Sequence, residues 1–68
     1  MTIGEKIRNF RVDHKLTVKD LAENIGYSSS AVSSWEAGTN APGVFAAKDL
    51  CDYMGITVDE LLKGVDSR

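Results

Sequence analysis

Apolar residues recur along this chain at the spacing of amphipathic helices. Near the start, Ile3, Ile7 and Phe10 are four and three residues apart, and they predict a helix over residues 3 to about 14. The same criterion predicts helices over about 18–25, 29–37, 44–54 and 58–63. No segment alternates apolar and polar residues as a half-buried strand does. The chain is therefore predicted to be all-α, with five helices in a compact fold.

Three of these helices begin with a threonine that is followed three residues later by an acidic residue. The pairs are Thr2 with Glu5, Thr17 with Asp20, and Thr57 with Glu60. Each pair predicts a capping box, because the hydroxyl accepts from a free amide of the first turn and the carboxylate accepts from the threonine amide. Ser28 occupies the same place before the third helix.

The spacing of Ala22, Gly26 and Val32 predicts a helix-turn-helix between Thr17 and about Gly38. This motif needs a small residue where its helices meet, a residue that tolerates positive φ in the turn, and an apolar residue that holds the next helix. Other small helical bundles can contain the same three residues at these intervals. Turn-forming residues then predict a loop over residues 38–43.

With 68 residues, 43% hydrophobic and 26% charged, the chain fits one soluble domain over residues 1–68. It has neither the continuous apolar run of a signal peptide nor the roughly 20 apolar residues that span a bilayer. We therefore expect a cytoplasmic protein without membrane contact. The single cysteine, Cys51, lies in an apolar pattern and is expected to be buried.

The net charge of -2 hides an uneven distribution. Residues 1–19 carry five basic and two acidic side chains, whereas residues 20–40 carry three acidic side chains and no basic one. Any contact with nucleic-acid phosphates must therefore rely on the first 19 residues. The expected contributors are Lys6, Arg8, Lys15 and Lys19.

Catalytic chemistry has no support in the sequence. His14 has no cysteine or second histidine at ligand spacing, so a solvated side chain at a helix end is favoured over a metal ligand. The serine cluster has no histidine or lysine placed to activate a nucleophile; its members are Ser28, Ser29, Ser30, Ser33 and Ser34. We expect neither an enzyme nor a metal or other cofactor.

The chain resembles the Cro and lambdoid-repressor (Xre-type) helix-turn-helix domains over roughly residues 3–63. The resemblance rests on an L-T-x-x-x-L-A opening, a G-x-S-x-S-x-V-S-x-W-E-x-G run with a proline four residues later, and an L-x-x-x-M-G-I-T-x-D-E-L-L close. It implies a lambda-repressor-like fold and a DNA-binding transcriptional regulator whose helix over residues 29–37 enters the major groove.

The resemblance also implies roles for individual residues. Operator DNA would be contacted by Thr17, Lys19, Ser28, Ser29, Ser30, Ala31, Ser34, Thr39 and Asn40, with Tyr27 at the entrance of the third helix. Bases would face the third helix, and phosphates would face the start of the second helix and the loop after the third. Arg11 and Glu36 match a structural ion pair of similar proteins.

Several positions depart from the family pattern. Val18 stands where a glutamine is usual, and the serines of the third helix lack the bidentate fork with which arginine selects guanine. Phe45 and Tyr53 stand where polar or small residues are usual. Phe45, with Val44, is either an exposed partner or dimer interface or an additional apolar wedge of the core.

Three hypotheses follow. The first is an operator-binding regulator of Cro or repressor type that acts as a homodimer. The second is an antirepressor-like modulator that binds a partner repressor instead of, or together with, DNA, and it is motivated by the acidic charge and by Phe45. The third, an antitoxin-like module, has no specific residue behind it.

Overall fold

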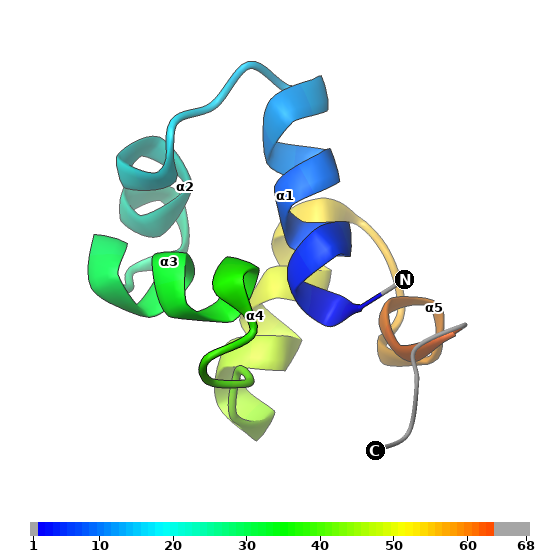
Figure 1. Ribbon diagram of the computed structural model, residues 1–68. Helices are drawn as coiled ribbons and strands as arrows, with labels where there is room; N and C mark the ends of the chain where they lie inside the picture. Colours follow the sequence, from blue (N-terminus) through cyan, green and yellow to red (C-terminus); the bar gives the residue numbers. More distant parts are fainter. Residues whose placement is uncertain (1, 64–68) are drawn as a thin grey trace.

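Five helices follow one another along the chain in a computed structural model that describes residues 2–63 (Figure 1). They are α1 (Ile3–Asp13), α2 (Val18–Ile25), α3 (Ser29–Ala37), α4 (Val44–Met54) and α5 (Val58–Leu62). The described residues contain no strand, so the all-α prediction is confirmed. Helices α1 and α5 end one residue earlier than predicted. Met1 and residues 64–68 of the predicted domain lie outside the described residues.

The three predicted capping boxes are present. The threonine hydroxyl accepts from the amide three residues on at 3.1 Å in α1, 3.0 Å in α2 and 3.1 Å in α5. In each box the acidic side chain also accepts from the threonine amide. These backbone hydrogen bonds lower the pKa of the Glu5 and Asp20 carboxyls, because they favour the ionised form. Local side-chain chemistry therefore sets where these helices begin.

Helices α1 to α4 end at a left-handed residue, which is either a glycine or a lysine. Gly26 and Gly38 close α2 and α3 with φ of 82° and 81°, a left-handed conformation that glycine adopts without steric cost. After α1 the left-handed residue is Lys15, with φ of 55°. Its amide bonds to the Val12 carbonyl and the Leu16 amide to the Arg11 carbonyl, which is the Schellman pattern. This turn carries a conformational strain that the sequence pattern does not reveal.

The core is built from all five helices. Its buried hydrophobic residues are Ile7, Leu21, Ala22, Val32, Trp35, Ala46, Leu50, Cys51 and Leu61. Ala22 and Val32 occupy the helix-turn-helix contact that the sequence predicts. Burial raises the pKa of the Cys51 thiol, as expected for an apolar surrounding.

Gly4 brings α1 against the end of α3. A Cβ atom at this position would lie 2.2 Å from the Trp35 carbonyl oxygen and 2.8 Å from that of Glu36. Both atoms belong to the backbone, so they cannot move aside as a flexible side chain does. In Figure 1, α2 and α3 lie on one side of α1 and α5 lies on the other. Gly4 thus fixes how closely the helix-turn-helix approaches the rest of the molecule.

Candidate nucleic-acid interface

The outer face of α3 carries small polar side chains. Val32 and Trp35 are buried and fix which side of the helix faces inward. The opposite side exposes Ser29, Ser30, Ser33 and Ala37, and the following loop exposes Thr39 and Asn40. The hydroxyls of the three serines form no hydrogen bond with any other described residue. These hydroxyls therefore have no role in holding the described fold together.

The residues expected to face DNA are not equally presented. Ser29 and Ser30 are exposed, whereas Ala31 is half-buried against the core and Ser34 is half-buried at the edge of the face. Ser33 is exposed on the same face, although it was not among the expected contacts. Ser33 lies four residues after Ser29 and three after Ser30, and this spacing predicts that the three serines share one face of the helix.

Two residues at the entrance of α3 serve the fold. The Ser28 hydroxyl accepts from the Ala31 amide at 3.1 Å and caps the helix. The Tyr27 hydroxyl donates to Asp49 at 2.8 Å, and its ring lies edge-on to Trp35 at 5.4 Å. The bond to Asp49 raises the pKa of Tyr27. Tyr27 therefore ties the start of α3 to α4.

The start of α2 already carries a negative charge, which is the carboxylate of its own capping box. The Asp20 carboxylate accepts from the Thr17 amide at 3.1 Å, at the helix end where the dipole favours negative charge. The Thr17 hydroxyl accepts from the Asp20 amide, so its oxygen is in use while its proton can be donated outward. Lys19 is exposed beside this box and supplies the single positive charge of α2 and α3. Phosphate would meet both a cation and a carboxylate here.

Arg11 and Glu36 form a bidentate ion pair. The guanidinium Nε and Nη2 lie 2.8 Å and 3.0 Å from the two carboxylate oxygens, and the side chains are 16% and 10% exposed. Nη1 also donates to the Leu16 carbonyl at 2.9 Å. The hydrogen bonds to Glu36 raise the pKa of Arg11. One guanidinium thus joins the end of α3 to the turn between α1 and α2.

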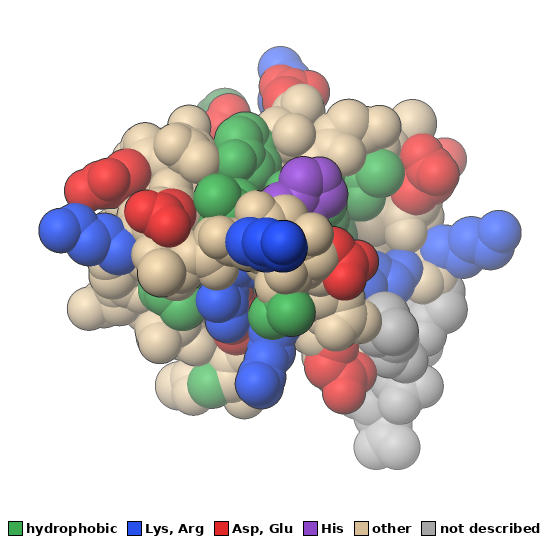
Figure 2. All heavy atoms as spheres, turned by 90° about the horizontal axis from the view of Figure 1, so that it is seen from above, with side chains coloured by type: hydrophobic (Ala, Val, Ile, Leu, Met, Phe, Trp, Pro, Cys, Tyr) green, Lys and Arg blue, Asp and Glu red, His purple; other side chains and the backbone are tan. Residues whose placement is uncertain are grey.

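Not every basic residue of the first 19 is available to phosphate. The Lys6 amine donates to the carbonyls of Glu60, at 3.0 Å, and Lys63. It thereby neutralises the negative end of the α5 dipole, which corrects its expected role in phosphate contact. Arg8, Lys15 and Lys19 remain exposed. Figure 2 shows basic and acidic side chains interspersed at the end where α1 meets α2, with no large basic patch.

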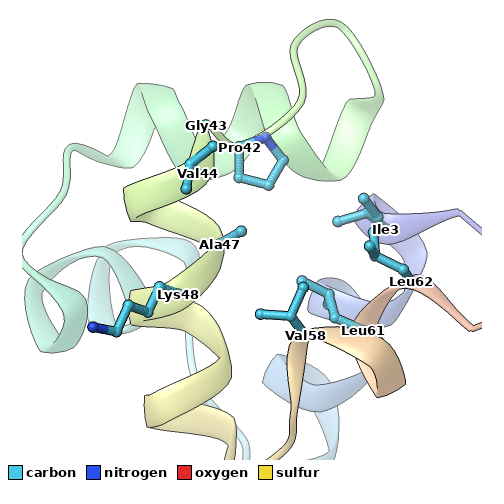
Figure 3. Close-up of a pocket in the computed structure, with 9 residues that line it drawn as sticks. All are labelled: Ile3, Pro42, Gly43, Val44, Ala47, Lys48, Val58, Leu61 and Leu62. Carbon is cyan, nitrogen blue, oxygen red and sulfur yellow. The ribbon is translucent and has the colours of Figure 1, made fainter.

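A second surface lies at the start of α4. Val44 and Phe45 are 84% and 82% exposed, so Phe45 is not a wedge of the core. Val44, but not Phe45, lines an apolar groove of about 390 Å³ that runs between α4 and α5 (Figure 3). It is lined by Ile3, Pro42, Gly43, Val44, Ala47, Lys48, Val58, Leu61 and Leu62. Tyr53, the other unusual aromatic residue, accepts a hydrogen bond from Asn24 at 2.8 Å.

His14 lies at the end of α1, where its ring stacks on Phe10 at 3.9 Å. Its Nδ1 lies 2.9 Å from the Phe10 carbonyl oxygen. Over residues 2–63 no group of three metal-ligating side chains comes together. None of the helices in that range combines the length and the apolar character that crossing a bilayer requires.

Comparison with known proteins shows that residues 7–61 of the chain match the model of a helix-turn-helix family. The chain belongs to the Cro and lambdoid-repressor (Xre) type of helix-turn-helix proteins. It is 36% identical over 64 residues to the transcriptional activator BcrR of Enterococcus faecalis, covering 94% of this chain and 31% of BcrR.

Two further relatives are transcriptional regulators by name. The regulator DdrOP3 of Deinococcus deserti is 33% identical over 66 residues, covering 97% of this chain and 51% of DdrOP3. The cryptic phage CTXphi repressor RstR of Vibrio cholerae is 30% identical over 59 residues, covering 87% of this chain and 53% of RstR. The chain therefore spans about a third to a half of the length of these relatives.

Proposed function

We propose that this protein is a DNA-binding transcriptional regulator whose helix α3 enters the major groove of an operator. The outer face of α3 carries this proposal, because its serine hydroxyls are exposed and unused by the fold. The inner face of the same helix is held by Val32, Trp35 and the Arg11–Glu36 pair. Relatives of this chain that are named as transcriptional regulators or repressors support the same function.

In this proposal the base edges are read by hydroxyls that can donate or accept but cannot form a bidentate contact. The proposed DNA contacts are Thr17, Lys19, Ser28, Ser29, Ser30, Ala31, Ser34, Thr39 and Asn40, and we add Ser33. Ser28 and Ala31 contribute mainly by holding and shaping the start of α3. Arg8 and Lys15 extend the set of phosphate contacts in place of Lys6.

One copy of the protein is expected to bind DNA weakly, because it has few free basic side chains and phosphate contacts supply much of the affinity for DNA. We therefore propose that the protein acts as a homodimer that places two α3 helices in successive major grooves. A cytoplasmic location belongs to the same proposal.

Fluorescence anisotropy with labelled operator duplexes over a salt series tests this function. Ser30→Ala should weaken binding about two- to tenfold, the range of one neutral hydrogen bond. Tyr53→Phe removes a hydroxyl from α4 instead and should bind like the parent. Absence of binding by the parent protein even at low salt would show that direct DNA recognition is wrong.

A second candidate function is modulation of a partner repressor through Val44 and Phe45. The exposure of these two residues favours it, because large apolar side chains on a surface anchor protein contacts. The test is the elution volume of a mixture with a candidate repressor. A complex that forms with the parent and is lost in Phe45→Ala supports this function, and an unchanged elution volume counts against it.

A further inference from the structure

We infer that the hydrogen bond from the Tyr27 hydroxyl to Asp49 fixes the angle at which the start of α3 meets DNA. Tyr27 is then a positioning residue of the interface, with no base or phosphate contact of its own. It acts by holding Ser29 and Ser30, whose exposed hydroxyls are the proposed contacts. The inference rests on the proposed function and deepens it.

The end of α3 is anchored to α1. The Arg11 guanidinium binds both carboxylate oxygens of Glu36, and Gly4 lies directly against the backbone of the same helix end. Further along α3, buried Val32 packs into the core. All of these contacts are made three or more residues after Ser29. They hold the end and the inner face of α3, and the first turn needs a separate support.

Tyr27 supplies this support from the turn between α2 and α3. Its amide donates to the Ala22 carbonyl at 2.8 Å, so the end of α2 fixes its backbone. Its ring lies edge-on to Trp35 at 5.4 Å, and its hydroxyl donates to the Asp49 carboxylate on α4 at 2.8 Å. The next residue, Ser28, caps α3. One side chain therefore connects the first turn of α3 to α4.

The orientation of α3 depends on this connection more than the core does. In the described part of the chain, α3 packs mainly on α1 and α2 and has little other contact with α4. Ser29 lies about 10 Å along the helix from Glu36, so a tilt of about 5° at the Glu36 end moves Ser29 by about 1 Å. A displacement of this size is larger than the range of hydrogen-bond lengths and breaks a contact with a base edge.

A second tyrosine hydroxyl provides a matched control. Tyr53 accepts from the Asn24 side chain at 2.8 Å, which joins α2 to α4 by a hydrogen bond of the same length. Neither residue belongs to α3 or to the turn that precedes it. Loss of this hydrogen bond removes a link to α4 without releasing the start of α3.

Fluorescence anisotropy with a labelled operator duplex provides the first test, under conditions in which circular dichroism shows every variant to be folded. Tyr27→Phe keeps the ring against Trp35 and loses only the hydroxyl, so DNA affinity should fall about two- to tenfold. Tyr53→Phe should bind like the parent. Parent-like affinity of Tyr27→Phe would overturn the inference.

Two variants of Asp49 separate the hydrogen bond from the charge. Asp49→Asn and Asp49→Ala remove the same negative charge, but asparagine keeps an oxygen that can accept from the Tyr27 hydroxyl. Asp49→Asn should therefore bind DNA about two- to tenfold more tightly than Asp49→Ala. Equal affinities of the two variants would contradict a role for the hydrogen bond.

Combining Tyr27→Phe with Asp49→Ala distinguishes positioning from direct contact with DNA. If the hydroxyl acts through Asp49, then Tyr27→Phe should cause no further loss of affinity in the Asp49→Ala protein. A loss as large as in the parent would show that the hydroxyl binds DNA itself, and the inference would then be wrong.

Residual dipolar couplings of the backbone amides test the positioning without DNA. They report the orientation of α3 relative to α1 in solution. Tyr27→Phe and Asp49→Ala should change the couplings of α3 relative to those of α1, whereas Tyr53→Phe should leave them as in the parent. If these changes appear in a protein that binds no DNA, the proposed function fails while the positioning of α3 by Tyr27 stands. Unchanged α3 couplings in Tyr27→Phe would overturn the inference whether or not the parent binds DNA.

Discussion

The outer face of α3 and the start of α4 are both exposed, but they are built from opposite kinds of side chain. The outer face of α3 presents short hydroxyls and no charged side chain, so affinity for DNA must come from neighbouring cations such as Lys15 and Lys19. The start of α4 presents Val44 and Phe45 beside an apolar groove, where affinity comes from burial. Salt weakens the first kind of contact and hardly affects the second. Ionic strength therefore separates the two surfaces experimentally.

The largest effect is expected from breaking the support of α3 itself with Gly4→Ala. The added Cβ would overlap the Trp35 and Glu36 carbonyl oxygens, so α3 must move away from α1. We expect a loss of about 2–4 kcal/mol in the free energy of unfolding, even though alanine favours helix by about 1 kcal/mol. Urea unfolding measures this loss. Ser33→Ala, which changes only the outer face of α3, should stay within about 0.5 kcal/mol; equal stability of Gly4→Ala and the parent would contradict the close approach.

A smaller effect, on DNA affinity, is expected from the negative charge of Asp20 at the start of α2. Asp20→Asn keeps a capping oxygen at the start of α2 but removes the negative charge next to the proposed phosphate contacts. We expect DNA binding to strengthen by roughly two- to fivefold at low salt, and the gain to shrink as salt rises. Glu60→Gln makes the same change in the capping box of α5, outside the proposed interface, and should leave affinity unchanged. Equal effects of the two variants would show that Asp20 does not face phosphate.

The smallest effect separates stability from DNA affinity at one residue. Lys15→Gly relieves the left-handed conformation of Lys15, so the free energy of unfolding should rise by about 0.5–1 kcal/mol. The same change removes a proposed phosphate contact and should flatten the slope of log affinity against log salt by about 0.9. Thermal unfolding and anisotropy measure the two quantities. Lys15→Gln loses the charge but keeps the strained backbone, so it should show the change in affinity without the gain in stability.

Much of the fold was predictable because its signals are local. The threonine boxes and the glycine ends act within four residues of where a helix starts or stops, and the structure forms them as the sequence indicates. The apolar periodicity selected the inward faces, including Val32 and Trp35. Helix number and start positions therefore needed no knowledge of how the helices pack.

What could not be predicted depends on distances between segments far apart in the chain. No pattern in the sequence marks Gly4, because only packing shows that the carbonyl oxygens of Trp35 and Glu36 lie against it. Lys6 read as a free cation, and only the position of α5 shows where its amine is bound. Whether Phe45 was exposed or buried depended on how α4 is turned against its neighbours. These features depend on tertiary packing, which determines which candidate site residues are available for binding.

The guanidinium of Arg11 has a consequence for the thermodynamics of association. It holds Glu36 at the end of α3 and the Leu16 carbonyl just before α2, so the two helices of the motif share one anchor. They are therefore expected to dock as a single rigid unit, with little backbone left to order on contact. Association with a duplex would then order little additional backbone in α2 and α3, and its entropy would be dominated by released ions and water.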